Sequence, residues 1–240
     1  MREIESLFII TLCAVSLLSG SVNAETLFFD DFEAGMDKWP EMPTLAIDVD
    51  PDNASNHVLV FDTTNDNTNV DALFLEGFED LTDYTMKAKF NIVGETANYA
   101  VTGFIVRAQS ATEYMLVEPA NNRQGVRGIL NIFERAAGQW PIVADGKVNL
   151  DMNKWYELSV TVEGENLTAY IDGKKVAEHS KVAYPKGGFG IREWQSKTLI
   201  DDVEVYDAGG SSMPVEPRGK LAVTWGELKN YRISTKDLGY

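Results

Sequence analysis

Two short acidic segments, near the two ends of the predicted domain, carry residue types that could bind a cation. Residues 29–33 read FDDFE and precede Gly35 and Trp39, whereas residues 199–205 read LIDDVEV. Because the first and last strands of an antiparallel β domain are commonly neighbours, these carboxylates would converge and repel one another unless a cation joined them. Calcium takes several oxygen ligands, mainly carboxylates and backbone carbonyls. The pattern permits a calcium site, and the alternative is a set of solvated carboxylates on edge strands.

Side chains suited to acid–base or nucleophilic catalysis are few. The histidines are His57 and His179, and surface positions are expected for both. The sequence contains no G-x-S-x-G or H-E-x-x-H motif. Retaining glycosidases place two carboxylates about 5–5.5 Å apart, and the nearest acidic grouping, Glu76, Glu79 and Asp80, has the wrong spacing for one strand face. We therefore predict no catalytic residues.

The elements that would position these side chains are short β-strands. Residues 155–164 alternate strictly, with the apolar side chains of YELSVTVE all on one face, which is the two-residue period of a half-buried strand. Residues 167–171 form a second strand, and the following Asp172 and Gly173 predict a tight hairpin turn with positive φ. Residues 84–93 alternate in the same way.

Strand-like segments recur along the chain and are separated by turns rich in Asp, Asn and Gly. They are expected at residues 26–32, 45–49, 57–62, 70–75, 84–93, 100–108, 113–118, 126–133, 156–163, 167–172, 188–192 and 199–206. No segment shows a long helical period. About a dozen short strands predict an all-β fold, a two-sheet antiparallel β-sandwich or jelly roll.

The segment WYELSVTVEGENLTAYIDGKKVAE resembles the hairpin region of the laminin-G-like/concanavalin A-like family. The pair FDDFEAGMDKW and IDDVEV is similar to the ends of jelly-roll carbohydrate-binding modules and laminin-G-like domains, many of which hold one structural calcium there. By that resemblance Asp30, Glu33 and Asp202 are the expected calcium ligands, with Asp31 and Asp201 as alternates. The resemblance also implies a sandwich of the kind that commonly binds carbohydrate.

Two further segments extend the resemblance. TGFIVRAQSATEYMLVE and GGFGIREWQSKTLIDDVEV resemble laminin-G-like families that include some fructan-binding modules and the 3-keto-disaccharide hydrolase-like branch. Sugar recognition needs an aromatic face against C–H groups and planar polar groups for paired hydroxyls, and the guanidinium fork of arginine suits the latter. The sugar-binding residues that the resemblance implies are Arg107, Tyr114, Arg192, Trp194 and Gln195, with Glu118, Arg127 and Glu134 as neighbours. The alternative for each is an outward-facing strand residue or, for Tyr114 and Trp194, a core or rim aromatic.

Four regions are expected along the chain. Residues 1–24 are predicted to be a secretory signal peptide, since an apolar run too short to span a bilayer precedes the small residues SVNA. A retained membrane anchor is the alternative. Residues 25–207 are the predicted laminin-G-like domain, residues 208–219 a proline-containing linker, and residues 220–240 a short tail whose role is open.

Composition narrows the classes of partner. The single cysteine, Cys13, lies in the predicted signal peptide, so disulfides and thiolate zinc sites are excluded from the mature chain. A formal net charge of −16 argues against nucleic acid and anionic membranes, and no membrane insertion is expected after signal cleavage. We expect an exported protein, periplasmic or extracellular, that binds carbohydrate and holds a structural calcium. The alternatives are a glycoside hydrolase of the 3-keto-disaccharide hydrolase-like group and a protein-binding envelope or adhesion module; the oligomeric state is left open.

Overall fold

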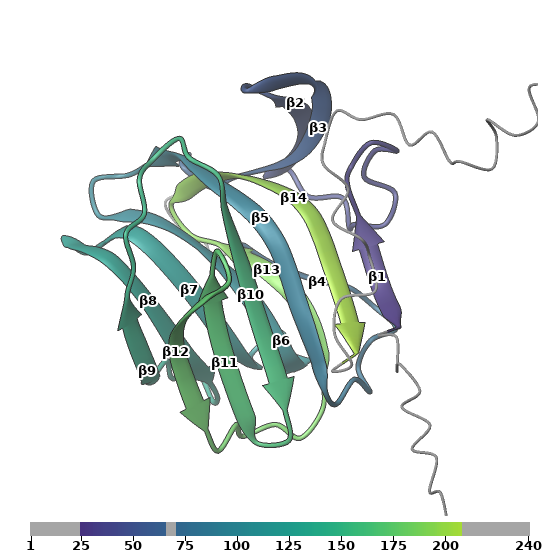
Figure 1. The fold of residues 1–240 in the computed structure, drawn as a ribbon, viewed down its shortest axis with the longest axis vertical. Coiled ribbons are helices and arrows are strands. Elements are labelled where there is room, and N and C mark those ends of the chain that lie inside the picture. The colour runs from purple at the N-terminus through teal and green to yellow at the C-terminus, as the bar shows by residue number, and fades with distance from the viewer. Residues whose placement is uncertain (1–24, 66–70, 208–240) are drawn as a thin grey trace, which may run out of the picture.

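The protein is a sandwich of two antiparallel sheets, as a computed structural model describes it for residues 25–65 and 71–207 (Figure 1). These residues contain no α-helix, and within them no helix is long and apolar enough to cross a membrane. The predicted all-β sandwich is therefore confirmed. The predicted signal peptide, linker and tail lie outside the described residues.

The larger sheet has eight strands in the order β12-β11-β10-β5-β14-β3-β2, with β1 paired to β14 beside this path. Its strands are β1 (Thr26–Asp30), β2 (Leu45–Asp50), β3 (Asn53–Asp62), β5 (Tyr84–Glu95), β10 (Tyr156–Glu163), β11 (Asn166–Ile171), β12 (Lys174–Ser180) and β14 (Ser196–Asp207). The predicted pairing of the first and last strands is confirmed, since Asp30 of β1 lies opposite Val203 of β14.

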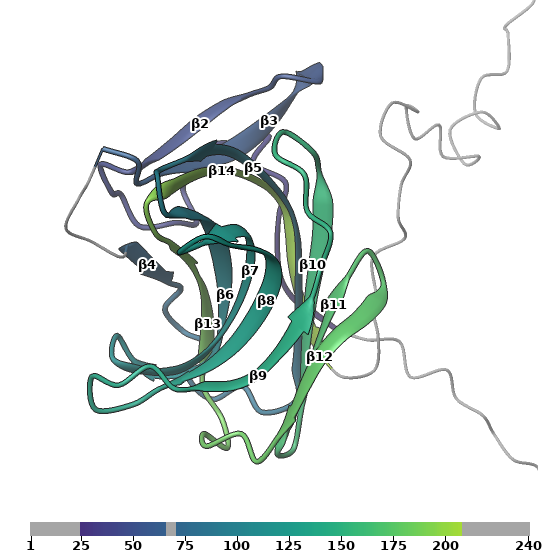
Figure 2. The same ribbon diagram turned by 90° about the vertical axis from the view of Figure 1, so that its left-hand side faces the viewer.

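The smaller sheet has six strands in the order β4-β13-β6-β7-β8-β9. Its strands are β4 (Asp71–Phe74), β6 (Tyr99–Ser110), β7 (Glu113–Arg123), β8 (Val126–Arg135), β9 (Ile142–Lys147) and β13 (Gly188–Glu193). Figure 2 shows that these strands bend, so that the face turned away from the larger sheet is concave. Its opposite face packs on the larger sheet.

The apolar positions of the alternating strands form one core between the sheets. Phe90 and Val160 contribute from the larger sheet, and Phe104, Val117 and Ile132 contribute from the smaller one; all five are fully buried. Burying this much apolar surface is the main favourable term in folding. The strict alternation in the sequence therefore arises because these strands bury one face of the sheet in this core.

The hairpin turn between β11 and β12 has the predicted geometry, because Asp172 has φ 49° and Gly173 has φ 73°. The two strands that the sequence did not predict are β9 and β12. Both are edge strands and both are partly exposed along their length; β12 is largely polar, and β9 has the short sequence IVADGK without alternation. An edge strand that packs few side chains has no strong period, so its sequence resembles that of a loop.

One acidic side chain lies inside the sandwich. Glu193, at the end of β13, is fully buried, and its Oε1 accepts hydrogen bonds from Ser196 Oγ and Thr198 Oγ1, both at 2.7 Å. Its Oε2 has no hydrogen-bond partner among the described residues. Burial raises the pKa of Glu193 to about 8, although the bonds from Ser196 and Thr198 act in the opposite direction. Glu193 is therefore largely protonated at neutral pH.

A buried carboxyl of this kind makes stability depend on pH. The unfolded carboxyl has a pKa of about 4.3, so between that value and about 8 unfolding releases a proton, and stability falls as the pH rises. The stabilising effect of the protonated group is complete below the unfolded pKa and is lost as the pH passes the folded one. Glu193→Gln copies the protonated carboxyl, so it should melt several degrees higher than the wild type at pH 9 and nearly like it at pH 5. Calorimetric melting curves measure both, and a constant difference across this range would contradict the assignment.

Candidate functional site

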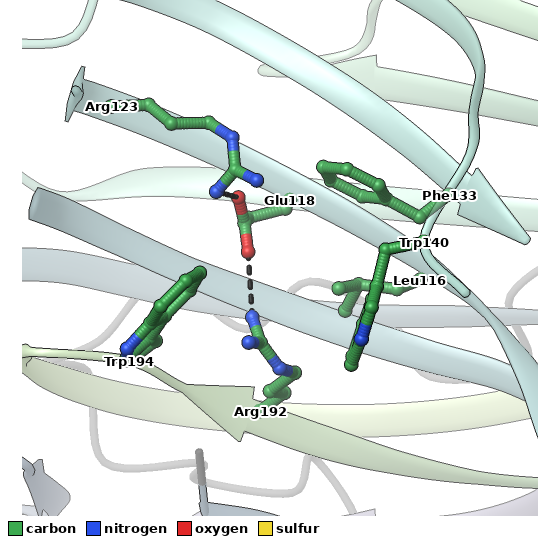
Figure 3. A pocket seen from close by; sticks show the side chains of 7 residues that line it. All are labelled: Leu116, Glu118, Arg123, Phe133, Trp140, Arg192 and Trp194. Atoms are coloured by element: carbon green, nitrogen blue, oxygen red, sulfur yellow. Dashed lines mark hydrogen bonds and ion pairs between the residues drawn. The ribbon is translucent and has the colours of Figure 1, made fainter. Parts of the chain in front are cut away.

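A pocket of about 200 Å³ opens on the concave face of the smaller sheet (Figure 3). Strands β7, β8 and β13 and the connections that follow β8 and β13 supply its walls. The lining residues are Leu116, Glu118, Arg123, Phe133, Trp140, Arg192 and Trp194. The pocket therefore combines an acidic group, two guanidinium groups and several flat apolar faces in a small space.

The polar centre of the pocket is Glu118, which two arginines hold. Its Oε2 accepts a hydrogen bond from Arg192 Nη1 at 2.7 Å, and its Oε1 accepts one from Arg123 Nη1 at 2.8 Å. Glu118 is 1% exposed and Arg192 is 3% exposed, so the pair is almost fully removed from water. Charge-assisted hydrogen bonds of this geometry are strong and directional. They fix the positions of both guanidinium groups in the pocket.

Gly103 of β6 makes this contact possible. Arg192 of β13 lies opposite Gly103, and Phe104 lies opposite Val117 of β7, so the register places Gly103 beside Glu118 as well. A Cβ atom on Gly103 would lie 2.6 Å from Leu116 Cδ1. With no side chain in between, the Arg192 guanidinium crosses over β6 to reach a carboxylate two strands away.

Two tryptophans stand on either side of Arg192. The Arg192 Cζ lies 4.9 Å from the ring centroid of Trp140 and 5.1 Å from that of Trp194. Trp194 stacks on Tyr99 with 4.4 Å between centroids, and Trp140 meets Phe133 edge to face at 6.3 Å. These contacts hold both indoles in place, and cation–π attraction ties them to the guanidinium group. Figure 3 shows Arg192 between the two indoles.

The charge of Arg192 survives its burial. Desolvation lowers the pKa of the guanidinium group, and repulsion by Arg123 and Arg135 lowers it further, while Glu118 raises it. The ordinary pKa of arginine lies so far above neutrality that the group stays protonated. The pocket thus offers charged N–H donors, a carboxylate acceptor and apolar ring faces to a ligand.

Arg192 and Trp194 are the two predicted sugar-binding residues that line the pocket. Tyr114 lies beside Trp140 instead; it is fully buried, accepts a hydrogen bond from Arg135 at 2.8 Å and meets Trp140 edge to face at 6.0 Å between centroids. It therefore supports the wall as a core aromatic.

Arg107 and Gln195 lie elsewhere. Arg107 is fully buried and donates hydrogen bonds to the backbone oxygens of Tyr184 at 2.8 Å and Gly164 at 3.1 Å, which ties two connections to β6. Gln195 lies in the turn between β13 and β14 and accepts a hydrogen bond from Thr96 at 3.4 Å. Neither side chain lines the pocket, so the structure does not bring them together with Arg192.

Among the predicted neighbours, Glu118 is central, whereas Arg127 bonds Asn121 at 2.7 Å away from the pocket, and Glu134 is not a lining residue. The sequence reasoning did not find Arg123, Phe133, Trp140 and Leu116. For Leu116 a local signal existed, because the alternation of β7 places it on the same face as Glu118. Trp140 lies in a connection, where no period marks it.

The predicted calcium ligands each have their own partners. The Oδ2 of Asp30 accepts a hydrogen bond from Trp39 Nε1 at 2.8 Å, Glu33 meets the His57 ring at 2.9 Å, and Asp202 pairs with Lys89 at 2.8 Å. The alternates behave similarly: Asp31 bonds the Glu33 amide at 3.3 Å and Asp201 accepts from Asn56 at 3.0 Å. In residues 25–65 and 71–207, no three His, Cys, Asp or Glu side chains form a group that could hold a metal ion. To hold calcium, these carboxylates would have to exchange their present partners for the ion.

Comparisons with known proteins match the segment that carries much of the pocket. The family model described as the galactocerebrosidase C-terminal lectin domain matches residues 126–195, which include Trp140, Arg192 and Trp194. The chain is 25% identical to the levanase of Bacillus subtilis (strain 168) over 75 residues, which are 31% of this chain and 11% of the levanase. The match thus spans a small part of that relative.

Solved structures share the fold. The carbohydrate-binding module CBM66 from Bacillus subtilis matches with a TM-score of 0.55 and 16% identity, over 69% of this chain and 93% of the module. The Emp47p carbohydrate recognition domain matches with a TM-score of 0.57 and 16% identity, over 79% of this chain and 99% of that domain. A third match is domain 4 of AbnA, an extracellular arabinanase of Geobacillus stearothermophilus, which was solved in complex with arabinotriose. Its TM-score is 0.50 and its identity 16%, over 77% of this chain and 93% of that domain. The predicted resemblance to the concanavalin-like jelly-roll family is confirmed, and at these identities the structural matches show the fold alone.

The buried charges of the pocket lead to a prediction about stability. Glu118→Ala would leave the guanidinium groups of Arg192 and Arg123 without their carboxylate, and removing one partner of a buried pair costs about 3–5 kcal/mol. The matched control is Glu95→Ala, because Glu95 makes an exposed ion pair with Arg127 at 3.9 Å, and such pairs contribute about 0–1 kcal/mol. Urea unfolding measures both free energies, and equal losses would show that Glu118 does not hold the pocket together.

Proposed function

We propose that this protein is an exported carbohydrate-binding module that holds a sugar ring between Trp140 and Trp194. The observation that supports this most is the Arg192–Glu118–Arg123 network between two indole faces. A sugar ring has apolar C–H faces and a rim of hydroxyl groups. The indoles suit the former, while guanidinium donors and a carboxylate acceptor suit the latter.

The fold and its relatives support the same proposal. The neighbours include a carbohydrate-binding module, a carbohydrate recognition domain and a domain solved with arabinotriose. Because folds host many functions, these likenesses support the proposal only together with the pocket. Support for export comes from the predicted signal peptide and from the description of the arabinanase as extracellular.

The pocket supports binding better than hydrolysis. Glycoside hydrolysis generally uses two carboxyl groups on either side of the scissile bond. Among the described residues that line the pocket, Glu118 is the one carboxylate, and both of its oxygens are bonded to arginines. This arrangement suits a fixed acceptor for sugar hydroxyls.

The proposed binding is tested by a glycan-array screen of the mature chain, followed by calorimetry with the glycan that binds. Trp194→Ala should weaken binding about thirtyfold, since truncating an aromatic anchor costs about 2 kcal/mol. Trp155→Ala is the matched control, because Trp155 bonds Asp50 of the larger sheet and does not line the pocket. Melting points of both variants identify any loss of folding. If Trp194→Ala binds like the wild type, the sugar does not lie in this pocket.

Calcium binding near β1 and β14 also stays a proposal, supported by the sequence resemblance and by the pairing of these two strands. Binding would require Asp30, Glu33 and Asp202 to exchange their present partners for the ion. An ion that binds only the folded protein raises its stability by about 2.7 kcal/mol at a hundred times its Kd. The melting point should then be higher in millimolar calcium than in EDTA, and Asp202→Ala should remove the difference. Equal midpoints for the wild type in the two buffers would contradict calcium binding.

A further inference from the structure

The pocket is positively charged in a strongly acidic protein. Arg123 and Arg192 line it, and Arg135 lies beside it, with its Cζ 4.5 Å from the ring centroid of the lining residue Trp140. Two guanidinium groups bond Glu118 and a third lies against the outer wall of the pocket, so the three arginines and one carboxylate together carry two unbalanced positive charges. The whole chain has 21 basic and 37 acidic residues and a formal net charge of −16. A positive centre on this background is an electrostatic feature that requires an explanation.

The described residues do not neutralise this centre. Arg135 donates to the backbone oxygen of Ala111 at 2.7 Å and to the Tyr114 hydroxyl at 2.8 Å, both uncharged partners, and no ion pair of Arg135 occurs within this part of the chain. Mutual repulsion of the guanidinium groups contributes to the lowered pKa of Arg192. Keeping like charges together costs free energy unless an anion joins them.

Unused donors occur in the same cluster. The Nε atoms of Arg192 and Arg135 are buried and have no hydrogen-bond partner in residues 25–65 and 71–207. Buried donors without partners are uncommon in folded proteins, and each one invites a search for a missing acceptor. Both arginines contact the same indole ring, so two donors beside one wall of the pocket have no acceptor in the described part of the chain.

We propose that the pocket selects acidic sugars, in which a carboxylate or sulfate group on the ring meets the guanidinium groups of Arg123 and Arg192. This inference rests on the proposed function, since it names the class of sugar for that same pocket. A neutral sugar needs donors and acceptors in similar numbers, and Glu118 with one arginine would provide them. An anionic group adds charge-assisted and bidentate hydrogen bonds to the arginines. It also removes the repulsion among them.

The test compares acidic polysaccharides with neutral partners of the same backbone. Biolayer interferometry with the mature chain would measure polygalacturonate, alginate and hyaluronan beside their carboxyl-reduced forms, and dextran sulfate beside dextran. Levan and arabinan serve as further neutral polymers. We expect at least one acidic polymer to bind tenfold or more tightly than its neutral partner, and the pair that shows this difference identifies the group as carboxylate or sulfate.

Two variants assign the preference to the pocket. Arg123→Gln removes one lining guanidinium group and should lower the ratio of acidic to neutral affinity about tenfold. Arg127→Gln removes the same charge from an exposed position, where Arg127 contacts Asn121 and Glu95 outside the pocket, and should leave the ratio unchanged. A ratio is the readout because a general weakening of the site would not alter it.

The outcomes separate the two proposals. Binding of neutral polymers alone, or of both kinds equally, would overturn the acidic preference and leave the carbohydrate-binding function standing. Equal effects of Arg123→Gln and Arg127→Gln would show that net charge, not the pocket, sets the preference, and would overturn it too. Binding of no polymer in the glycan array and in this panel would overturn both proposals.

Discussion

The pocket depends on one interaction, the ion pair between Arg192 and Glu118 across β6. The two residues come from strands that are not neighbours, and they meet because Gly103 leaves the space between them open. Removing two charges from water is costly, and their attraction offsets that cost only when the geometry is good. The register of β13, β6 and β7 supplies this geometry, since pairing along three strands fixes where each side chain leaves the sheet. A slip of one residue would send Arg192 into the core.

The same strand carries a second buried ionisable group on its other face. Arg192 points to the concave face and Glu193 toward the core, as the alternation along β13 requires. Glu193 bonds Ser196 and Thr198 of β14, so it links the pocket strand to the larger sheet just beside the turn that holds Trp194. A neutral carboxyl satisfies these hydroxyls, whereas an ionised one would be unfavourable in the core. The contact between β13 and β14 beside Trp194 thus includes a carboxyl group whose pKa burial raises to about 8.

The sequence predicts local features, such as strands and turns, but it does not predict contacts that depend on the register between strands. Alternation was enough for the β10–β11 hairpin and for most strands, and residue type was enough to select Arg192 and Trp194. It also selected Arg107, whose guanidinium group serves buried backbone oxygens, because an arginine in a core strand and one in a pocket look alike in a sequence. Trp140 was not predicted because it lies in a connection, where the sequence has no period. Arg123 was not predicted because the sequence does not show which residues of neighbouring strands lie side by side. The pairing of the first and last strands, which carry the acidic segments, was predicted from topology. The sequence did not show that Asp30 and Asp202 would contact donors of the protein itself, Trp39 and Lys89.

Glu118 links the structure of the pocket to the class of ligand proposed for it. As a counter-charge it allows two arginines to be buried side by side, and as a single carboxylate it leaves the cluster with Arg135 positive. A second acidic residue in the lining would have balanced the two lining arginines, Arg123 and Arg192, and suited neutral ligands. The net negative charge of the chain repels polyanions at long range, although ionic strength screens this beyond about 8–10 Å. An anionic sugar therefore gains binding energy only where its charged group reaches the guanidinium groups directly, which makes close fit, and not general attraction, the basis of selection.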